Sequence, residues 1–167
     1  LVPKQYILVH LFAGNKTRGL SPEKKRDLLL ALSSALPNIS LVVSGGTNDR
    51  TEALQVADGL RANVIAGEAT LQELTHLIQG SLGVVSIDTG VAHMAAQLRM
   101  PLVVLTGCLG SHWWQPEQYG KEAPITVFSR ADLCTSGHVY KEYPDCINAI
   151  NMDDVASRMT RSDTIAI

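Results

Sequence analysis

The run Asp88-Thr89-Gly90-Val91-Ala92-His93 has the residue types that could bind a phosphorylated sugar. It directly follows the apolar segment 83–87, so a strand is predicted to lead into a helix. Its glycine lets a ligand approach the backbone, and the first turn of a helix has free N–H groups that bind anions. Thr89 and His93 add a hydroxyl and an imidazole, while the Asp88 carboxylate suits sugar hydroxyls. The alternative is that Asp88 or Thr89 caps the helix and His93 packs on the sheet.

Apolar segments and helix signals alternate along the chain with short links. Strands that are apolar throughout, without polar alternation, are typical of a parallel sheet covered by helices on both faces. We therefore predict one doubly wound α/β domain of five or six strands, with its ligand beyond the carboxyl ends of the strands. The strands are expected at 6–11, 39–44, 63–66, 83–87, 101–105 and 125–128, and the helices at 22–36, 50–60, 71–79, 90–98 and 151–159.

The composition excludes several classes of protein. The 167 residues are 46% hydrophobic and 18% charged, with a formal net charge of −2, which argues against a disordered chain and against a nucleic-acid-binding protein. No apolar run approaches the ~20 residues of a membrane span. Three cysteines, an odd number, favour a reducing cytoplasm. Because the first residue is Leu1, we expect a piece of a longer protein or a processed one.

The run 88–96, followed by Leu98 and Pro101, resembles the signature of glycosyltransferase family 9, the bacterial heptosyltransferases. Segments that resemble four other motifs of this family occur in the same order: His10-Leu11-Phe12-Ala13-Gly14, Ser44-Gly45-Gly46-Thr47-Asn48-Asp49, Gly67 to Leu74, and Trp114-Gln115-Pro116. Together these motifs cover residues 6 to about 150. Five motifs in order make the resemblance specific, whereas any one of them would be weak evidence.

The resemblance implies a half of a larger enzyme. Members of the family have two Rossmann-like domains, of which the carboxy-terminal one binds the nucleotide sugar and the amino-terminal one binds the acceptor and supplies the general base. Residues 1–167 resemble only the carboxy-terminal domain, so no catalytic residue is expected in this chain. The implied reaction is metal-independent, inverting transfer of a sugar without a cofactor. Heptose from ADP-heptose would pass to lipopolysaccharide core or a related lipid-linked glycan, at the cytoplasmic face of the inner membrane.

The resemblance also implies donor-binding roles. Thr89, Gly90 and His93 would bind the phosphates, Asp88 the hydroxyls of the transferred sugar, and Lys16, or alternatively Arg18, the diphosphate. Asp49, or alternatively Glu52, would bind the ribose, and Gly45 lies in the turn before them. Leu71 would lie beside the base or, alternatively, in the core. Trp113 and Trp114 would shelter the cleft, face the missing domain or pack under their loop.

Some features depart from the family or suggest other functions. Val91 replaces the family's proline, Met100 replaces its glycine, and the segment after the last signature strand differs. These changes put the identity of the sugar and of the acceptor in doubt more than the fold.

The absence of the usual glycine-rich and nucleophile motifs disfavours a nicotinamide dehydrogenase, a P-loop NTPase and an α/β-hydrolase. A non-catalytic nucleotide-binding module and half of a sugar-nucleotide epimerase remain as alternatives. Cys108, Cys134 and Cys146 are expected to be buried thiols. The alternatives are a zinc site that includes His112 and His138, and a disulfide between Cys134 and Cys146.

Overall fold

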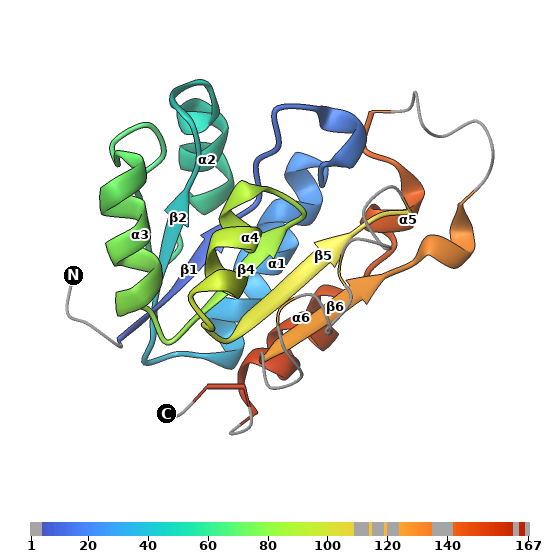
Figure 1. The fold of residues 1–167 in the computed structure, drawn as a ribbon. Helices are drawn as coiled ribbons and strands as arrows, with labels where there is room; N and C mark the ends of the chain where they lie inside the picture. The colour runs from blue at the N-terminus through green and yellow to red at the C-terminus, as the bar shows by residue number, and fades with distance from the viewer. Residues whose placement is uncertain are drawn as a thin grey trace.

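The structure is a computed structural model, and it describes residues 5–108, 114, 119, 124–134, 142–161 and 164–165. Six parallel strands form one sheet in the order β3-β2-β1-β4-β5-β6 (Figure 1). The fold class predicted from the sequence is therefore confirmed, with six strands rather than five. The strands are β1 (Tyr6–His10), β2 (Ser40–Ser44), β3 (Ala62–Val64), β4 (Gly83–Ile87), β5 (Leu102–Thr106) and β6 (Ile125–Ser129).

Short polar side chains begin most of the longer helices. The Ser21 hydroxyl accepts a hydrogen bond from the Lys24 backbone N–H, and Thr70 forms a capping box with Glu73. The helices are α1 (Pro22–Ala35), α2 (Arg50–Ala57), α3 (Leu71–Gly80), α4 (Gly90–Gln97), α5 (Asp145–Asn148) and α6 (Met152–Met159), and the 3-10 turns are η1 (Lys16–Arg18), η2 (Thr47–Asp49) and η4 (Ala131–Leu133).

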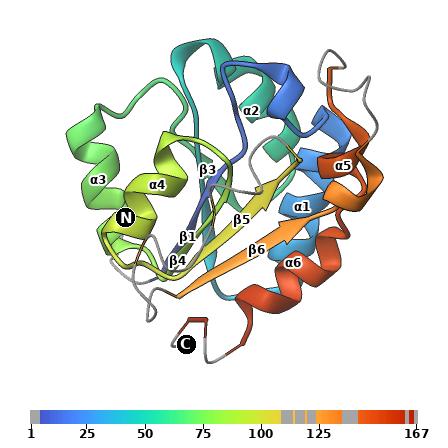
Figure 2. The same cartoon turned by 45° about the vertical axis from the view of Figure 1, so that its right-hand side comes forward.

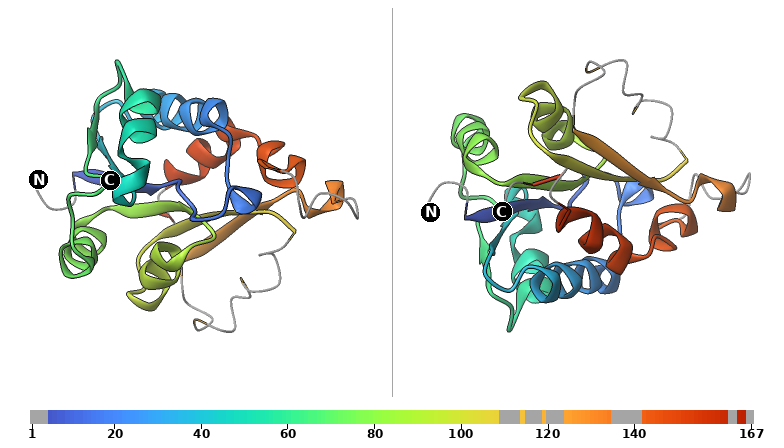
Figure 3. Two further views of the ribbon diagram at one scale, coloured as in Figure 1. Left: turned by 90° about the horizontal axis from the view of Figure 1, so that it is seen from above. Right: turned by 90° about the horizontal axis from the view of Figure 1, so that it is seen from below.

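The helices cover both faces of the sheet. Viewed along the layers, α1, α2 and α6 lie on one face and α3 and α4 on the other (Figure 3). Successive residues of a strand point to opposite faces, so Ile7 and Val9 join one buried cluster, whereas Tyr6 and Leu8 join the other. Two apolar layers thus sandwich the sheet, which explains why its strands are apolar throughout.

The strand order reverses beside β1, and this places the candidate site. On one side of β1 lie β2 and then β3, which come from the first half of the chain. On its other side lie β4, β5 and β6, which come from the second half (Figure 2). His10 at the end of β1 is in register with Ser44 of β2 and Ser86 of β4. In open α/β sheets, ligands bind at this switch point, beyond the carboxyl ends of the strands.

Most predicted elements are present with shifted ends. The helix expected at 50–60 ends at Ala57, and the strand expected at 63–66 spans Ala62–Val64. The four short helical segments η1, η2, η4 and α5 were not predicted, because elements of three or four residues are too short to show a periodic apolar pattern. In the described part of the chain, no helix has the length and apolar character of a membrane span.

Candidate functional site

A cavity of about 420 Å³ opens where the carboxyl ends of β1 and β4 lie side by side. It is lined from three segments that are distant in sequence: the end of β1 and the following loop, η1, and the turn between β4 and α4. The lining residues are His10, Phe12, Ala13, Gly14, Arg18, Asp88, Thr89, Gly90 and His93. A larger hollow of about 850 Å³ lies between α1 and α6, away from the strand ends. We therefore place the candidate site at the smaller cavity.

The first turn of α4 is open to this cavity. A Cβ atom added at Gly90 would meet no heavy atom within 4 Å, and Gly90 is not among the glycines with positive φ, so neither packing nor backbone conformation requires a glycine there. Thr89 occupies the N-cap position but makes no side-chain capping bond. The capping alternative is therefore wrong for Thr89, and the first N–H groups of α4 remain suited to an anion.

Thr89 is oriented by its neighbour Ser86. The Ser86 hydroxyl donates to the Ile87 carbonyl at 2.7 Å, and the Thr89 hydroxyl lies 3.3 Å from the Ser86 oxygen. Because the proton of Ser86 is already used, Thr89 is the donor of this second hydrogen bond. For Thr89 to donate to a phosphate, its hydroxyl would have to leave Ser86.

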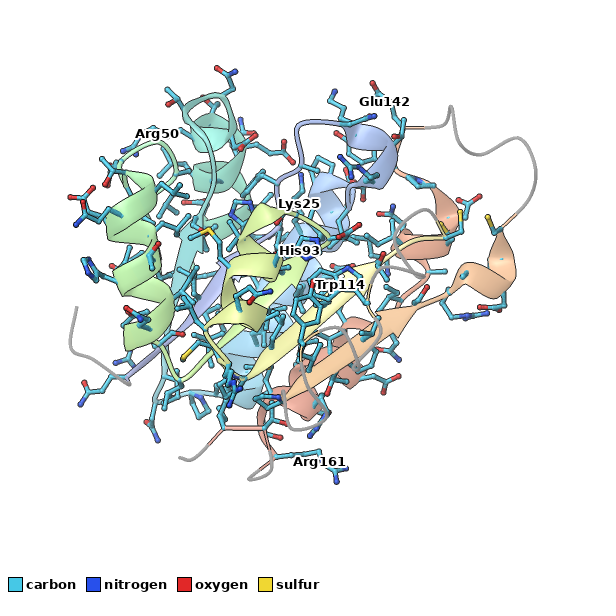
Figure 4. The ribbon with its side chains drawn as sticks, viewed as in Figure 1. Lys25, Arg50, His93, Trp114, Glu142 and Arg161 are labelled. Atoms are coloured by element: carbon cyan, nitrogen blue, oxygen red, sulfur yellow. The ribbon has the colours of Figure 1, made fainter. Side chains whose placement is uncertain are left out.

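Asp88 and His93 lie in one aromatic cluster beside the cavity. Asp88 Oδ1 accepts a hydrogen bond from the Trp114 indole N–H at 2.9 Å and lies 3.6 Å from His93 Nε2. The rings of His93 and Trp114 (Figure 4) stack with their centroids 4.4 Å apart. His93 Nδ1 lies 2.5 Å from the Tyr119 hydroxyl. Asp88 therefore binds Trp114 rather than capping α4. Trp114 is buried, which agrees with the alternative that it packs against the domain. Its hydrogen bond to Asp88 and the contact of Tyr119 with His93 were not predicted from the sequence.

His10 lies at the end of β1 and was named from the sequence only as part of a motif. Its Nδ1 is 3.0 Å from the Ser44 hydroxyl. Burial lowers the pKa of His10 to about 4, although Asp49 and a hydrogen bond to the Phe12 backbone act in the opposite direction. His10 is therefore neutral at pH 7 and contributes a hydrogen-bonding group to the cavity but no charge.

The lowered pKa of His10 predicts a pH-dependent stability. The unfolded chain binds a proton at this histidine below its ordinary value of 6.5, whereas the folded chain does so only below about 4. Stability from this group is therefore complete above pH 6.5 and is lost as the pH falls toward 4, by about 2–3 kcal/mol. Urea unfolding at pH 7.5 and pH 4.5 should show this loss in the unmodified chain and not in the His10→Gln variant. An equal loss in both chains would contradict the assignment.

The two cations proposed for the diphosphate are separated by the fold. Lys16 Nζ lies 3.6 Å from Glu142 Oε2 and 5.9 Å from the centre of the Tyr143 ring, and Lys16 does not line the cavity. Figure 4 shows Glu142 near η1 at the upper edge of the molecule. Arg18, two residues further along the same turn, does line the cavity. The structure thus places the second choice, Arg18, at the site instead of Lys16.

The expected ribose carboxylates lie outside the cavity lining and already have partners. Asp49 Oδ2 accepts a hydrogen bond from the Gly46 N–H at 2.7 Å, and Glu52 Oε1 binds the buried Lys25 Nζ at 2.6 Å. Gly45 has a packing role, since a Cβ there would lie 3.0 Å from the Phe12 ring and 3.1 Å from Asp49 Cβ. In each of the two carboxylates, the second oxygen has no hydrogen bond to a described residue.

Leu71 begins α3 and its side chain is 70% exposed. The alternative that it belongs to the core is therefore wrong. An exposed leucine at the start of a helix is compatible with contact to a flat apolar group, but Leu71 does not line the cavity.

Cys146 is buried in α5, Cys108 is half-buried just after β5, and Cys134 is exposed at the end of η4, so the expectation of buried thiols is wrong for Cys134. Desolvation raises the pKa of Cys108 to about 12, and hydrogen bonding to Cys134 also contributes. Among the residues that the structure describes, no three His, Cys, Asp or Glu side chains form a group suited to a metal ion. The other expected members of these motifs, which are His112, Trp113, Gln115, Pro116 and His138, lie outside the described residues.

Comparison with known proteins supports a specific family. A family model described as glycosyltransferase family 9 (heptosyltransferase) matches residues 3–125. No curated protein sequence matches the chain. Among solved structures, E. coli ADP-heptose lps heptosyltransferase II is 19% identical with a TM-score of 0.73, and the match covers 95% of this chain and 46% of that one.

Two further structures agree with this result. A family 9 glycosyltransferase from Veillonella parvula is 17% identical, with a TM-score of 0.70 and coverage of 93% of this chain and 45% of that one. E. coli heptosyltransferase WaaC with ADP is 22% identical, with a TM-score of 0.62 and coverage of 75% and 38%. At these identities the likeness demonstrates a shared fold. The chain spans less than half the length of each of these three proteins.

Proposed function

Because the chain belongs to glycosyltransferase family 9, we propose that it is the donor-binding half of a heptosyltransferase. In this proposal it binds a nucleotide sugar, with ADP-heptose as the donor, and a second domain holds the glycan acceptor and the general base. The family is that of the heptosyltransferases, and two of the similar structures are an ADP-heptose lps heptosyltransferase and a heptosyltransferase with ADP, which supports this choice of donor. The acceptor would be lipopolysaccharide core or a related lipid-linked glycan at the inner membrane.

The observation that carries the proposal is the cavity at the switch point of the sheet, into which the start of α4 opens. Transfer of a sugar from a nucleoside diphosphate breaks the bond between the anomeric carbon and a phosphate oxygen, so negative charge develops on the diphosphate. Backbone N–H groups at a helix start stabilise such charge without reorganisation. The Arg18 guanidinium would add a fixed positive charge at the same cavity.

The remaining lining residues divide between phosphate and sugar. The Nε2–H group of His93 and the Thr89 hydroxyl would donate to phosphate oxygens. The Asp88 carboxylate repels phosphate and accepts hydrogen bonds, so it would bind hydroxyl groups of the sugar. We propose an inverting reaction without a metal ion or cofactor, in which this chain contributes no general base and its residues bind and orient the donor.

The choice between Arg18 and Lys16 gives the experiment that tests the proposal. Isothermal titration calorimetry with ADP should show binding by the unmodified chain. Arg18→Gln should weaken binding about tenfold or more, because a hydrogen bond to a charged group contributes about 1.5–3 kcal/mol. Lys16→Gln, the matched control, should change affinity less than about twofold, because Lys16 faces Glu142 and a solvated ion pair contributes little.

Two results would contradict the proposal. Undetectable binding of ADP, UDP and GDP alike by the folded chain would remove the nucleotide site. Equal losses in Arg18→Gln and Lys16→Gln would show that the chain binds ADP at another place or by general charge attraction.

A further inference from the structure

Four side chains form one connected cluster beside the candidate site: Asp88, His93, Trp114 and Tyr119. Asp88 and His93 line the cavity, whereas Trp114 and Tyr119 do not. The two aromatic rings stack on each other with centroids 5.7 Å apart and planes inclined by 18°. Trp114 is 5% exposed, so its indole N–H has a buried, fixed position from which it binds Asp88. Figure 4 shows Trp114 next to His93, beside α4 and β5.

The two oxygens of Asp88 have different surroundings. Oδ1 accepts the Trp114 N–H and faces His93 Nε2, whereas Oδ2 has no hydrogen bond or ion pair with any described residue. The Asp88 side chain is 12% exposed, and Oδ2 is not one of the buried side-chain oxygens that lack a partner, so this second oxygen is open to solvent. A carboxylate can only accept hydrogen bonds. Asp88 is thus prepared for a ligand that donates, such as a sugar hydroxyl.

His93 has a defined tautomer in this cluster. Its Nε2 lies 3.6 Å from Asp88 Oδ1, which is too far for a hydrogen bond, but the negative charge of the carboxylate favours the tautomer with the proton on Nε2. In the neutral imidazole, Nδ1 is then bare and accepts the Tyr119 O–H. Desolvation, together with the charge of Asp88, raises the pKa of Tyr119, so the phenol keeps the proton that it donates. Tyr119 therefore maintains His93 with its N–H donor at Nε2, on the side of Asp88.

We propose that Trp114 and Tyr119 are positioning residues for the nucleotide-sugar donor. Trp114 binds one oxygen of Asp88 and leaves the other for a sugar hydroxyl, while Tyr119 selects the tautomer in which His93 donates from Nε2. The inference rests on the proposed function. It adds that Asp88 distinguishes a sugar nucleotide from the bare nucleotide only when the Trp114 N–H fixes the Asp88 carboxylate.

The Trp114→Phe variant tests the first part, because it retains an aromatic ring beside His93 but loses the N–H donor. We expect binding of ADP-heptose to weaken about tenfold and binding of ADP to change less than about twofold. The ratio of the two affinities is the decisive quantity, since a loss of packing would weaken both ligands alike. Circular dichroism checks that the variant is folded.

A double-mutant cycle with Asp88→Ala connects the effect to the carboxylate. In the Asp88→Ala background, Trp114→Phe should have no further effect on ADP-heptose binding, because the group that Trp114 orients is absent. Additive losses would show that Trp114 acts elsewhere and would overturn its assignment.

Nitrogen-15 NMR of His93 tests the role of Tyr119 without any ligand. The unmodified chain should show a protonated Nε2 and a bare Nδ1, and Tyr119→Phe should show a mixture of tautomers. Tyr143→Phe is the matched control and should leave the signal unchanged. A protonated Nδ1 in the unmodified chain, or no change in Tyr119→Phe, would overturn this assignment.

Failure of the inference and failure of the proposed function have different signatures. If the unmodified chain binds neither ADP nor ADP-heptose, the proposed function is wrong, and the positioning roles that depend on it are wrong too. If the chain binds both ligands and Trp114→Phe leaves their affinity ratio unchanged, the proposed function stands and the inference alone is wrong.

Discussion

Replacing Gly90 with valine is expected to abolish detectable ADP binding while leaving the chain folded. The space beside Gly90 is empty of protein atoms, so the new side chain would enter the cavity that we assign to the diphosphate. It would separate the phosphate from two or more N–H donors of α4. Since each hydrogen bond to a charged group contributes about 1.5–3 kcal/mol, the affinity should fall by about 100-fold or more.

A smaller substitution at the same position separates binding from folding. Gly90→Ala should raise the free energy of unfolding by about 0.4–1 kcal/mol, because alanine restricts the unfolded chain and meets no obstacle in the folded one. It should nevertheless bind ADP more weakly than the unmodified chain. Gln97→Val, at the exposed far end of the same helix, is the control and should not affect binding. Unchanged ADP affinity in Gly90→Val would exclude the start of α4 as the phosphate site.

Gly67→Ala is expected to destabilise the fold by about 3 kcal/mol, the largest stability effect that we predict. Gly67 has a φ of +75°, and a Cβ there would lie 2.8 Å from Thr47 Cα. The backbone of Thr47 cannot swing away as a flexible side chain would, so η2 must shift. Two costs therefore add: the left-handed backbone conformation and the steric overlap.

Gly59→Ala provides a matched control for this prediction. Gly59 has nearly the same φ, +72°, but a Cβ there would meet nothing within 4 Å. This variant should lose only the conformational part, about 1 kcal/mol. Urea unfolding of both variants measures the difference, provided that their m-values agree. If the two variants lose equal stability, the close approach of Gly67 to Thr47 does not constrain the fold.

The sequence alone was sufficient for the sheet and for the turn between β4 and α4. Strands such as Gly83–Ile87 are apolar at every position because both faces of the sheet are covered, and this pattern is local and readable. The turn at 88–93 was predicted correctly as a strand end that leads into a helix, because its signals also lie within a few residues. Its role in donor binding remains a prediction.

Short segments without periodicity could not be predicted in this way. The direction of a side chain in η1 depends on a turn of three residues whose hydrogen bonds include contacts across the chain, such as Tyr143 N–H to Lys16 O. Lys16 and Arg18 are equivalent in sequence terms, since both are basic and two residues apart. The structure places Arg18 at the cavity and Lys16 3.6 Å from Glu142, a residue that is distant in sequence.

What the sequence by itself determined is the fold class, the family resemblance and the position of the turn at 88–93, because each depends on local residue types. Only the tertiary structure decided which cation reaches the cavity, that His10 is buried enough to stay neutral, and that Trp114 and Tyr119 bind Asp88 and His93. The physical reason is the same in each case. A distance between two atoms or the loss of solvent around a group is the product of packing between remote segments, and no local pattern of residues encodes it.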